Sequence, residues 1–237
     1  MHALIICDNV TDSDILECGW GFSCLLDHHI LFDTGASADM LFHNMEKLQV
    51  DVDGIDTVVI SHDHWDHTGG LWQILKRRQG IKVAACPGFS REFKETVVAM
   101  KGVLSEAGEF RKMDSRFAVT GEIGGQYKGE YMPEQALLAV SGKGLVIITG
   151  CSHPGIVNMV KAAKAAMPGL PVTMVMGGFH LMDHDSLAIR SLADTFKTLG
   201  VEQVGPAHCT GKLAQDIFQD TYGDQYVTMG AGRELQL

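Results

Sequence analysis

The chain has 237 residues, 46% of them hydrophobic, which is enough apolar material for one large folded domain. Lys and Arg number 19 against 29 Asp and Glu, so the formal net charge is −10. This acidity argues against a broad nucleic-acid-binding face, because such faces work by neutralising phosphates. We therefore expect a single domain over residues 1–237 whose partner is a small molecule and not a nucleic acid.

The cysteine pattern and the N-terminal sequence bear on the compartment. The six cysteines show neither a C-x-x-C spacing nor the density of a small disulfide-stapled domain, and they indicate reduced thiols. The N-terminus lacks a basic start before an apolar signal-peptide core, and no later apolar run reaches membrane-spanning length. We expect a cytoplasmic protein that does not bind a membrane.

In the first part of the chain, apolar runs of strand length alternate with helical patterns. The expected strands cover 3–7, two runs within 20–33 separated by a turn at 27–29, 56–60 and 81–86, and the expected helices cover 36–48 and 70–79. The pattern weakens at about 87–133, where only a helix near 91–100 and a strand near 117–120 stand out. We interpret this stretch as a variable segment.

Strand and helix signals return after the variable segment. The expected strands cover 137–140, 145–149, 171–176, 201–204 and a last one near 226–229, and the expected helices cover 156–167, 186–199 and a stretch ending near 219. Strands leading into helices recur in both halves of the chain. This recurrence predicts two sheets between helical layers.

The loop after the strand at 56–60 is rich in metal-binding side chains, with three histidines and two aspartates between His62 and His67. Alternate residues of an extended backbone project to one side, so His62, His64 and Asp66 can converge while His67 points toward a neighbouring centre. A solvated polar loop is the alternative. It would explain one or two histidines, but burying so many titratable groups without a cation is costly.

Three further histidines share a placement. His153, His180 and His208 each follow an apolar strand-like run and lie in a loop that contains glycine. A single histidine after a strand is usually structural, yet the repetition favours ligands gathered at one edge of a sheet.

These motifs resemble those of the metallo-β-lactamase superfamily, and the resemblance covers residues from about 4 to 230. It implies an α/β fold, the αββα sandwich of two mixed β-sheets flanked by helices. The motifs that carry it are Phe32-Asp33-Thr34-Gly35, His62-x-His64-x-Asp66-His67, Gly150-Cys151-Ser152-His153 and Ala207-His208.

The resemblance also implies divalent metal ions, preferably two zinc ions, with iron or manganese as alternatives. Asp33 matches a supporting acid that orients the ligands. The implied ligands are His62, His64 and His153 for the first metal and Asp66, His67 and His208 for the second.

One position departs from the superfamily pattern. A bridging aspartate usually follows the strand after the His153 region, where this chain has Gly178-Phe179-His180. Either His180 substitutes as a ligand, or it acts as a catalytic acid or base. Asp66 is the candidate for positioning the nucleophile.

The segments at 150–155, 178–181 and 208–211 resemble one branch of the superfamily, the 7,8-dihydropterin-6-methyl-4-(β-D-ribofuranosyl)-aminobenzene-5'-phosphate synthase-like metal-dependent hydrolases. We expect a hydrolase that uses a metal-bound hydroxide on a small phosphate-containing molecule. The alternatives are a pterin-type synthase that releases diphosphate and a non-hydrolytic iron or oxygen-binding module.

Other residues near the ligands are candidate substrate contacts. Thr210 and Gly211 open an expected helix whose N–H groups could hold an anion, although an ordinary helix cap explains them as well. Ser152 is a similar candidate, and Trp65 could line the substrate entrance. If His208 faces the metal on an extended backbone, we expect the neighbouring Cys209 to point away, whereas Cys151 can share the side of His153.

Overall fold

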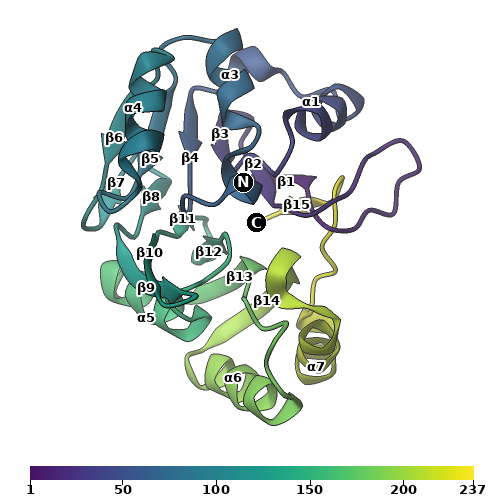
Figure 1. Ribbon diagram of the computed structural model, residues 1–237. Helices are drawn as coiled ribbons and strands as arrows, with labels where there is room; N and C mark the ends of the chain where they lie inside the picture. The colour runs from purple at the N-terminus through teal and green to yellow at the C-terminus, as the bar shows by residue number, and fades with distance from the viewer. The chain divides into compact units, whose positions relative to one another are not determined.

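The computed structural model describes residues 1–237, which form two compact units (Figure 1). Unit 1 comprises Met1–Gly108 and Met229–Leu237, and unit 2 comprises Glu109–Thr228. Each unit has a mixed β-sheet and a hydrophobic core of its own. The boundary between the units falls inside the expected variable segment.

Unit 1 contains a seven-stranded sheet with the order β15-β1-β2-β3-β4-β5-β6. Neighbours are antiparallel from β15 to β3 and parallel from β3 to β6. The strands are β1 (His2–Cys7), β2 (Ser23–Leu26), β3 (Ile30–Phe32), β4 (Thr57–Val59), β5 (Lys82–Ala85), β6 (Val103–Glu106) and β15 (Glu234–Gln236). The helices are α1 (Ala38–Lys47), α2 (Trp65–Thr68), α3 (Leu71–Arg77) and α4 (Arg91–Ala99), with a 3-10 turn η1 (Val52–Gly54).

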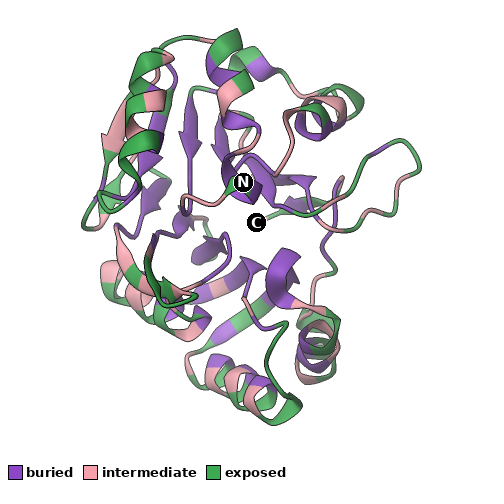
Figure 2. Ribbon diagram, in the orientation of Figure 1, coloured by how far each residue is buried: buried purple, intermediate pink, exposed green.

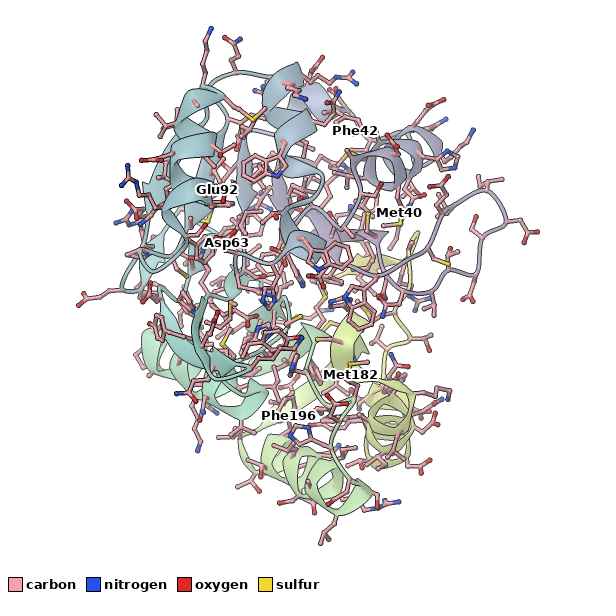
Figure 3. The ribbon with its side chains drawn as sticks, in the orientation of Figure 1. Met40, Phe42, Asp63, Glu92, Met182 and Phe196 are labelled. Carbon is pink, nitrogen blue, oxygen red and sulfur yellow. The ribbon has the colours of Figure 1, made fainter.

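Local sequence explains these elements of unit 1. Asp27 and His28 both have positive φ, 44° and 65°, in the three-residue connection between β2 and β3, where the His29 N–H donates to the Leu26 carbonyl at 3.1 Å. Ser37 caps α1 by accepting the N–H of Met40. The apolar faces of α1, α3 and α4 join the strand side chains in one core; Figure 3 shows Met40 and Phe42 on α1.

Unit 2 contains a six-stranded sheet with the order β14-β13-β12-β11-β8-β7 and a separate hairpin, β9-β10. The strands β12, β13 and β14 are parallel, and the other neighbours are antiparallel. The strands are β7 (Arg111–Lys112), β8 (Phe117–Val119), β9 (Ile123–Tyr127), β10 (Glu130–Glu134), β11 (Leu137–Val140), β12 (Leu145–Thr149), β13 (Val172–Gly178) and β14 (Val201–Ala207). The helices are α5 (Ile156–Ala166), α6 (Ser186–Thr198) and α7 (Lys212–Tyr222), with 3-10 turns η2 (His208–Thr210) and η3 (Gly223–Gln225).

The core of unit 2 lies between this sheet and the helices α5, α6 and α7. Phe196 of α6, labelled in Figure 3, packs its ring 5.6 Å from that of Phe179 and 5.5 Å from that of Phe218. In Figure 2 the strands of this sheet are mostly buried, while the helices expose their outer faces. The fold class is therefore the predicted one: two mixed β-sheets flanked by helices.

Two expectations about the C-terminal part were wrong. No strand forms at 226–229, where Tyr226 makes only an isolated bridge to Val204; the last strand is β15, which pairs with β1. Strand β14 runs on to Ala207, through residues expected to form a loop. In both segments, pairing with another strand outweighs local propensity. Residues 226–229 are β-prone but find no strand partner beyond one bridge, whereas Gly205 and Pro206 pair with β13. Pro206 is tolerated because β14 is an edge strand.

No helix of the chain is both long enough and apolar enough to cross a bilayer.

Candidate metal centre

The histidine loop of unit 1 follows β4 and brings two imidazole nitrogens together. His62 Nε2 lies 3.0 Å from His64 Nδ1, and the two ring centroids are 4.7 Å apart. Two nitrogen ligands of one tetrahedral zinc ion lie about 3.3 Å apart, given Zn–N bonds of about 2.0–2.1 Å. The spacing of these two nitrogens therefore suits a shared cation.

A second pair of donors comes from helix α2. Asp66 Oδ2 lies 3.6 Å from His67 Nε2, and both side chains are buried. That His67 points toward a neighbouring centre stays a prediction, since its ring centroid lies 4.2 Å from that of His62. An alternating extended backbone, used for that prediction, ends at His64, the N-cap of α2.

Asp33 lies behind these histidines and fixes their orientation. Its Oδ2 atom is 2.7 Å from His67 Nδ1 and accepts a hydrogen bond of 2.8 Å from the Ser61 hydroxyl. Since that hydroxyl donates to Asp33, it accepts from His62 Nδ1, which is 2.8 Å away. Both rings then carry hydrogen on Nδ1, and their Nε2 atoms remain as metal donors. Burial raises the pKa of the Asp33 carboxyl and outweighs the opposing effects of His67 and Ser61.

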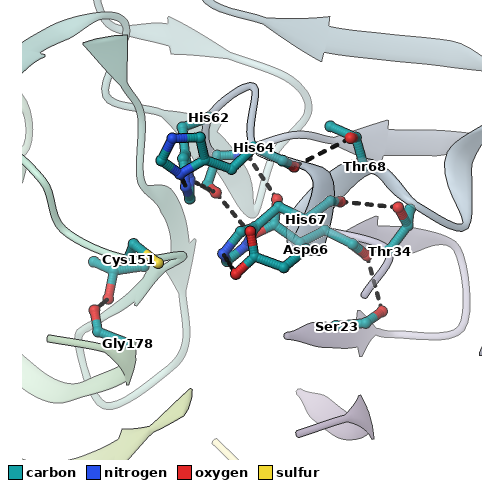
Figure 4. Close-up of polar contacts among 12 residues, drawn as sticks. Ser23, Thr34, His62, His64, Asp66, His67, Thr68, Cys151 and Gly178 are labelled. Atoms are coloured by element: carbon teal, nitrogen blue, oxygen red, sulfur yellow. Dashed lines mark hydrogen bonds and ion pairs between the residues drawn. The ribbon is translucent and has the colours of Figure 1, made fainter. Parts of the chain in front are cut away.

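The rest of the loop is anchored to the segment after β3. Figure 4 shows the Thr34 hydroxyl donating to the carbonyl of His67, at 2.8 Å, and the Thr68 hydroxyl donating to that of His64, at 3.1 Å. Trp65, between two ligand candidates, is 64% exposed. Its ring therefore belongs to the surface and not to the core.

In unit 2, the candidate histidines follow three adjacent strands. Parallel pairing aligns Thr149 of β12 with Gly177 of β13, and Gly178 of β13 with Ala207 of β14. The three strands therefore end at the same edge of the sheet, as the sequence predicted. His153, His180 and His208 follow these ends by four, two and one residues.

His153 is held by Glu134, a residue that the sequence did not single out. Its Nδ1 atom is 3.1 Å from Glu134 Oε2, and its backbone N–H donates to the same oxygen at 2.8 Å. Burial would raise the pKa of the Glu134 carboxyl, but the bonds from His153 and from the backbone of Ser152 lower it below its usual value. Glu134 lies just after the expected variable segment, and no local pattern marks this acid as functional.

His180 lies among Cys151, His153 and Cys209. The ligand atoms of Cys151, His153 and His180 are all within 4.8 Å of one another. His180 Nδ1 is buried and has no hydrogen-bond partner. A hydrogen bond with Cys209 raises the pKa of His180, against the opposing effect of burial.

Cys151 shares a donor cluster with His153, as expected, but the alternation used to predict the direction of Cys209 does not apply. The Cys209 Sγ atom donates to the Cys151 carbonyl at 3.5 Å and interacts with His180. The reason is that residues 208–210 form the 3-10 turn η2, so neighbouring side chains do not alternate as they do on a strand. Tyr127, at the end of β9, packs its ring 5.1 Å from that of His153 and 5.9 Å from that of His180.

The candidate anion contacts are engaged within the protein. The Ser152 hydroxyl donates to the Gly178 carbonyl at 2.7 Å, and the Thr210 hydroxyl donates to the Ala207 carbonyl at 2.6 Å. Helix α7 begins after Gly211 without a side-chain cap. An anion at this position would therefore meet backbone N–H groups, and the anion contact stays a prediction.

The absence of an acid on β13 has a steric reason. A Cβ atom at Gly178 would lie 2.2 Å from the Gly150 carbonyl oxygen, and one at Gly177 would lie 2.0 Å from that of Thr149. No side chain fits at either position, so the first side chain after this strand end with metal-binding or acid–base capacity is His180.

The residues present fit a metal. The donors are imidazole nitrogens with a carboxylate and a nearby thiol, buried carboxylates hold Nδ1 of two histidines, and His180 presents a buried nitrogen without a hydrogen-bond partner. Such a donor set suits zinc, iron or manganese. This fold and these donors define the class of the protein: a metal-binding α/β protein with mixed sheets.

Comparison with known proteins gives the family. The metallo-β-lactamase superfamily matches residues 26–160. The 7,8-dihydropterin-6-methyl-4-(β-D-ribofuranosyl)-aminobenzene-5'-phosphate synthase of Methanocaldococcus jannaschii is 32% identical, over 87% of this chain and 84% of its own. The chain belongs to the metallo-β-lactamase superfamily, as its motifs predicted.

Solved structures agree with this assignment. A metal-dependent hydrolase of the β-lactamase superfamily is 30% identical and has a TM-score of 0.83, covering 100% of this chain and 99% of that one. The metallo-β-lactamase fold protein YhfI of Bacillus subtilis, 13% identical with a TM-score of 0.70 and coverage of 99% for both chains, shares the fold. This fold implies a divalent metal, and most members of the superfamily are hydrolases.

Proposed function

We propose that this protein is a metal-dependent hydrolase of a small phosphate-containing molecule. One observation carries the proposal: Asp33 in unit 1 and Glu134 in unit 2 each bind the Nδ1 atom of a histidine, at 2.7 Å and 3.1 Å. A carboxylate behind a histidine is the usual support of a metal ligand. A cation held by these ligands would lower the pKa of a coordinated water to about 7 and so supply hydroxide at neutral pH.

The superfamily resemblance supports two cations, preferably zinc. We assign His62, His64 and His153 to the first cation, Asp66, His67 and His208 to the second, and His180 to either ligation or catalysis. Within this assignment, the Asp66 carboxylate would orient the attacking water. The His180 imidazole would protonate the leaving oxygen or hold a phosphoryl oxygen.

The substrate class rests on two supports. The relative from M. jannaschii is named for a product with a 5'-phosphate. The net charge of −10 disfavours a nucleic acid or an anionic membrane surface as partner. We accordingly propose a small-molecule substrate and a cytoplasmic location.

The second candidate function is that of a pterin-type synthase that releases diphosphate. The observation that favours it is the 32% identity to a named synthase over most of both chains. Diphosphate release from a diphosphorylated pterin, measured beside phosphate release from simple phosphoesters, separates the two activities.

The metal-site assignment is tested by His64→Ala. We expect the variant to stay folded, to lose most of its bound metal and to have no turnover, because His64 Nδ1 is a proposed donor. Metal content is measured by mass spectrometry on protein purified without chelator, and folding by circular dichroism. His43→Ala is the matched control, since its ring bonds the Ile15 carbonyl outside the cluster. Unchanged turnover in His64→Ala would refute the site, and redox-active iron without hydrolysis would favour an iron or oxygen-binding module instead.

A further inference from the structure

Glu134 is the last residue of β10, and its side chain is fully buried. An ionised carboxylate out of contact with water is costly unless hydrogen bonds satisfy both of its oxygens. The hydrogen bonds that the Glu134 carboxylate accepts come from one short segment, residues 151–153. The carboxylate is therefore dedicated to the loop that follows β12.

Three successive backbone N–H groups of this loop converge on the carboxylate. Cys151 and Ser152 donate to Oε1 at 2.9 Å and 2.7 Å, and His153 donates to Oε2 at 2.8 Å. The left-handed backbone of Ser152, with a φ of 70°, bends the chain so that neighbouring N–H groups can point to one side. The arrangement is an anion nest whose anion is a side chain of the same chain.

The fourth bond sets the chemistry of the His153 ring. A carboxylate that accepts N–H bonds has no hydrogen to give, so His153 Nδ1, at 3.1 Å from Oε2, is the donor. A neutral imidazole with its hydrogen on Nδ1 has its lone pair on Nε2. The same carboxylate thus fixes the backbone, the ring orientation and the tautomer of His153.

We propose that Glu134 is a positioning residue of the metal centre, which presents His153 to the cation through Nε2. The proposal rests on the proposed function, in which His153 is a metal ligand. It adds a residue from the hairpin β9-β10 to a centre whose predicted residues all lie elsewhere in the chain.

The hairpin is seated closely enough on the loop to act in this way. A Cβ atom at Gly125 of β9 would lie 2.7 Å from the Pro154 nitrogen and 2.9 Å from the His153 carbonyl carbon. Gly125 pairs with Met132 of β10, two residues before Glu134. Glycine at this position lets the two strands approach the loop so that the carboxylate reaches its donors.

The test uses Glu134→Gln, which keeps the shape of the side chain but replaces one hydrogen-bond-accepting oxygen with a donating NH₂ group. The amide oxygen can accept from the N–H groups of Cys151 and Ser152, but the NH₂ group then faces two donors, the backbone N–H and the Nδ1–H of His153. His153 is expected to move its hydrogen to Nε2, which removes the lone pair that would bind the metal. We expect zinc affinity, measured by competition with a chromophoric chelator, to fall about 10–100-fold.

Two comparisons separate positioning from general stability. Glu134→Asp keeps the carboxylate, and we expect it to recover part of the zinc affinity lost in Glu134→Gln. Glu130→Gln, an exposed change on the same strand, should bind zinc as the wild type does. Nitrogen NMR of the metal-free protein should show His153 with hydrogen on Nδ1 in the wild type and on Nε2 in Glu134→Gln.

The outcomes are distinguishable. A wild-type His153 with hydrogen on Nε2 overturns the proposal without any variant, even if Glu134→Gln does not fold. Wild-type zinc affinity in Glu134→Gln, with zinc bound by the wild type, overturns the role of Glu134 and leaves the proposed function intact. Failure of the wild-type protein to bind zinc, iron or manganese would instead refute the proposed function, and the role of Glu134 with it.

Discussion

Four non-glycine candidate site residues, one in unit 1 and three in unit 2, have left-handed backbones. The φ values of Asp33, Ser152, His180 and His208 are 54°, 70°, 52° and 48°. A side chain in this region costs about 1–2 kcal/mol relative to a right-handed backbone, and glycine would remove the cost. Such residues cluster at functional sites, where the side chain is needed in spite of the strain. The backbone therefore gives a reason, independent of the donor chemistry, to assign a function to His180.

His180→Asn tests that function with little change to the backbone, because asparagine tolerates the left-handed region. We expect the melting temperature to stay near that of the wild type and turnover to fall about 10²–10⁴-fold, the usual contribution of an acid–base group. Metal content then defines the role: loss of one equivalent identifies a ligand, and full metal content identifies an acid, a base or a substrate contact. His184→Asn, an exposed change four residues along, is the control. Wild-type turnover in His180→Asn would exclude both roles.

At the scale of elements, the position of the histidine loop depends on two glycines, Gly69 and Gly70, which allow it to pack closely on residues 34–36. The N–H of Gly69 donates to the Gly35 carbonyl at 2.9 Å. A Cβ atom at Gly69 would lie 2.2 Å from the Ala36 carbonyl oxygen, and one at Gly70 would lie 2.6 Å from that of Thr34. The loop is thus pressed against the segment that carries Asp33, which keeps the carboxylate within reach of His67.

Gly69→Ala should separate these two segments. We expect a loss of about 1–3 kcal/mol in the free energy of unfolding, the usual cost of overpacking, together with weaker zinc binding. Urea unfolding and chelator competition measure the two effects. Gly142→Ala is the control, because a Cβ atom there meets nothing within 4 Å. Equal stability of both variants would show that the loop can move aside without cost.

At the scale of the whole molecule, the core of unit 1 contains thiols shielded from water. Burial raises the pKa of Cys24 on β2, and burial together with Asp8 raises that of Cys7 on β1. These thiols keep their protons in the folded chain at a pH where thiols of the unfolded chain, with a pKa of about 8.5, lose theirs. The unfolded chain then binds fewer protons, so stability is fully present below about pH 8.5 and decreases as the pH rises above it.

This linkage predicts an alkaline loss of stability that Cys24→Ala reduces. Each buried thiol contributes up to about 1.4 kcal/mol per pH unit above pH 8.5 to the decrease in the free energy of unfolding. Urea unfolding between pH 7 and pH 10 measures the slope, which is independent of the constant cost of the alanine cavity. Cys18→Ala, an exposed position, should leave the slope unchanged. Identical slopes in the wild type and Cys24→Ala would contradict the prediction.

The sequence by itself determined the family, the candidate donors and most of the strands and helices outside residues 87–134. Strand and helix patterns depend on residues a few positions apart, and the histidine loop lies within six consecutive residues, His62 to His67. The adjacency of the three strand ends in unit 2 also followed from the sequence, because the same strand–loop–histidine arrangement recurs. Each of these features is encoded locally or by repetition.

Only the tertiary structure decided the contacts that join distant residues. Glu134 binds residues 17 to 19 positions further along the chain, Cys209 reaches the carbonyl of Cys151 across 58, and β15 pairs with β1 from the other end of the sequence. The physical reason is that a hydrogen bond depends on distance in space, and no spacing rule links such positions along the chain. The ligands could therefore be named from the sequence, whereas the carboxylate that orients His153 could not.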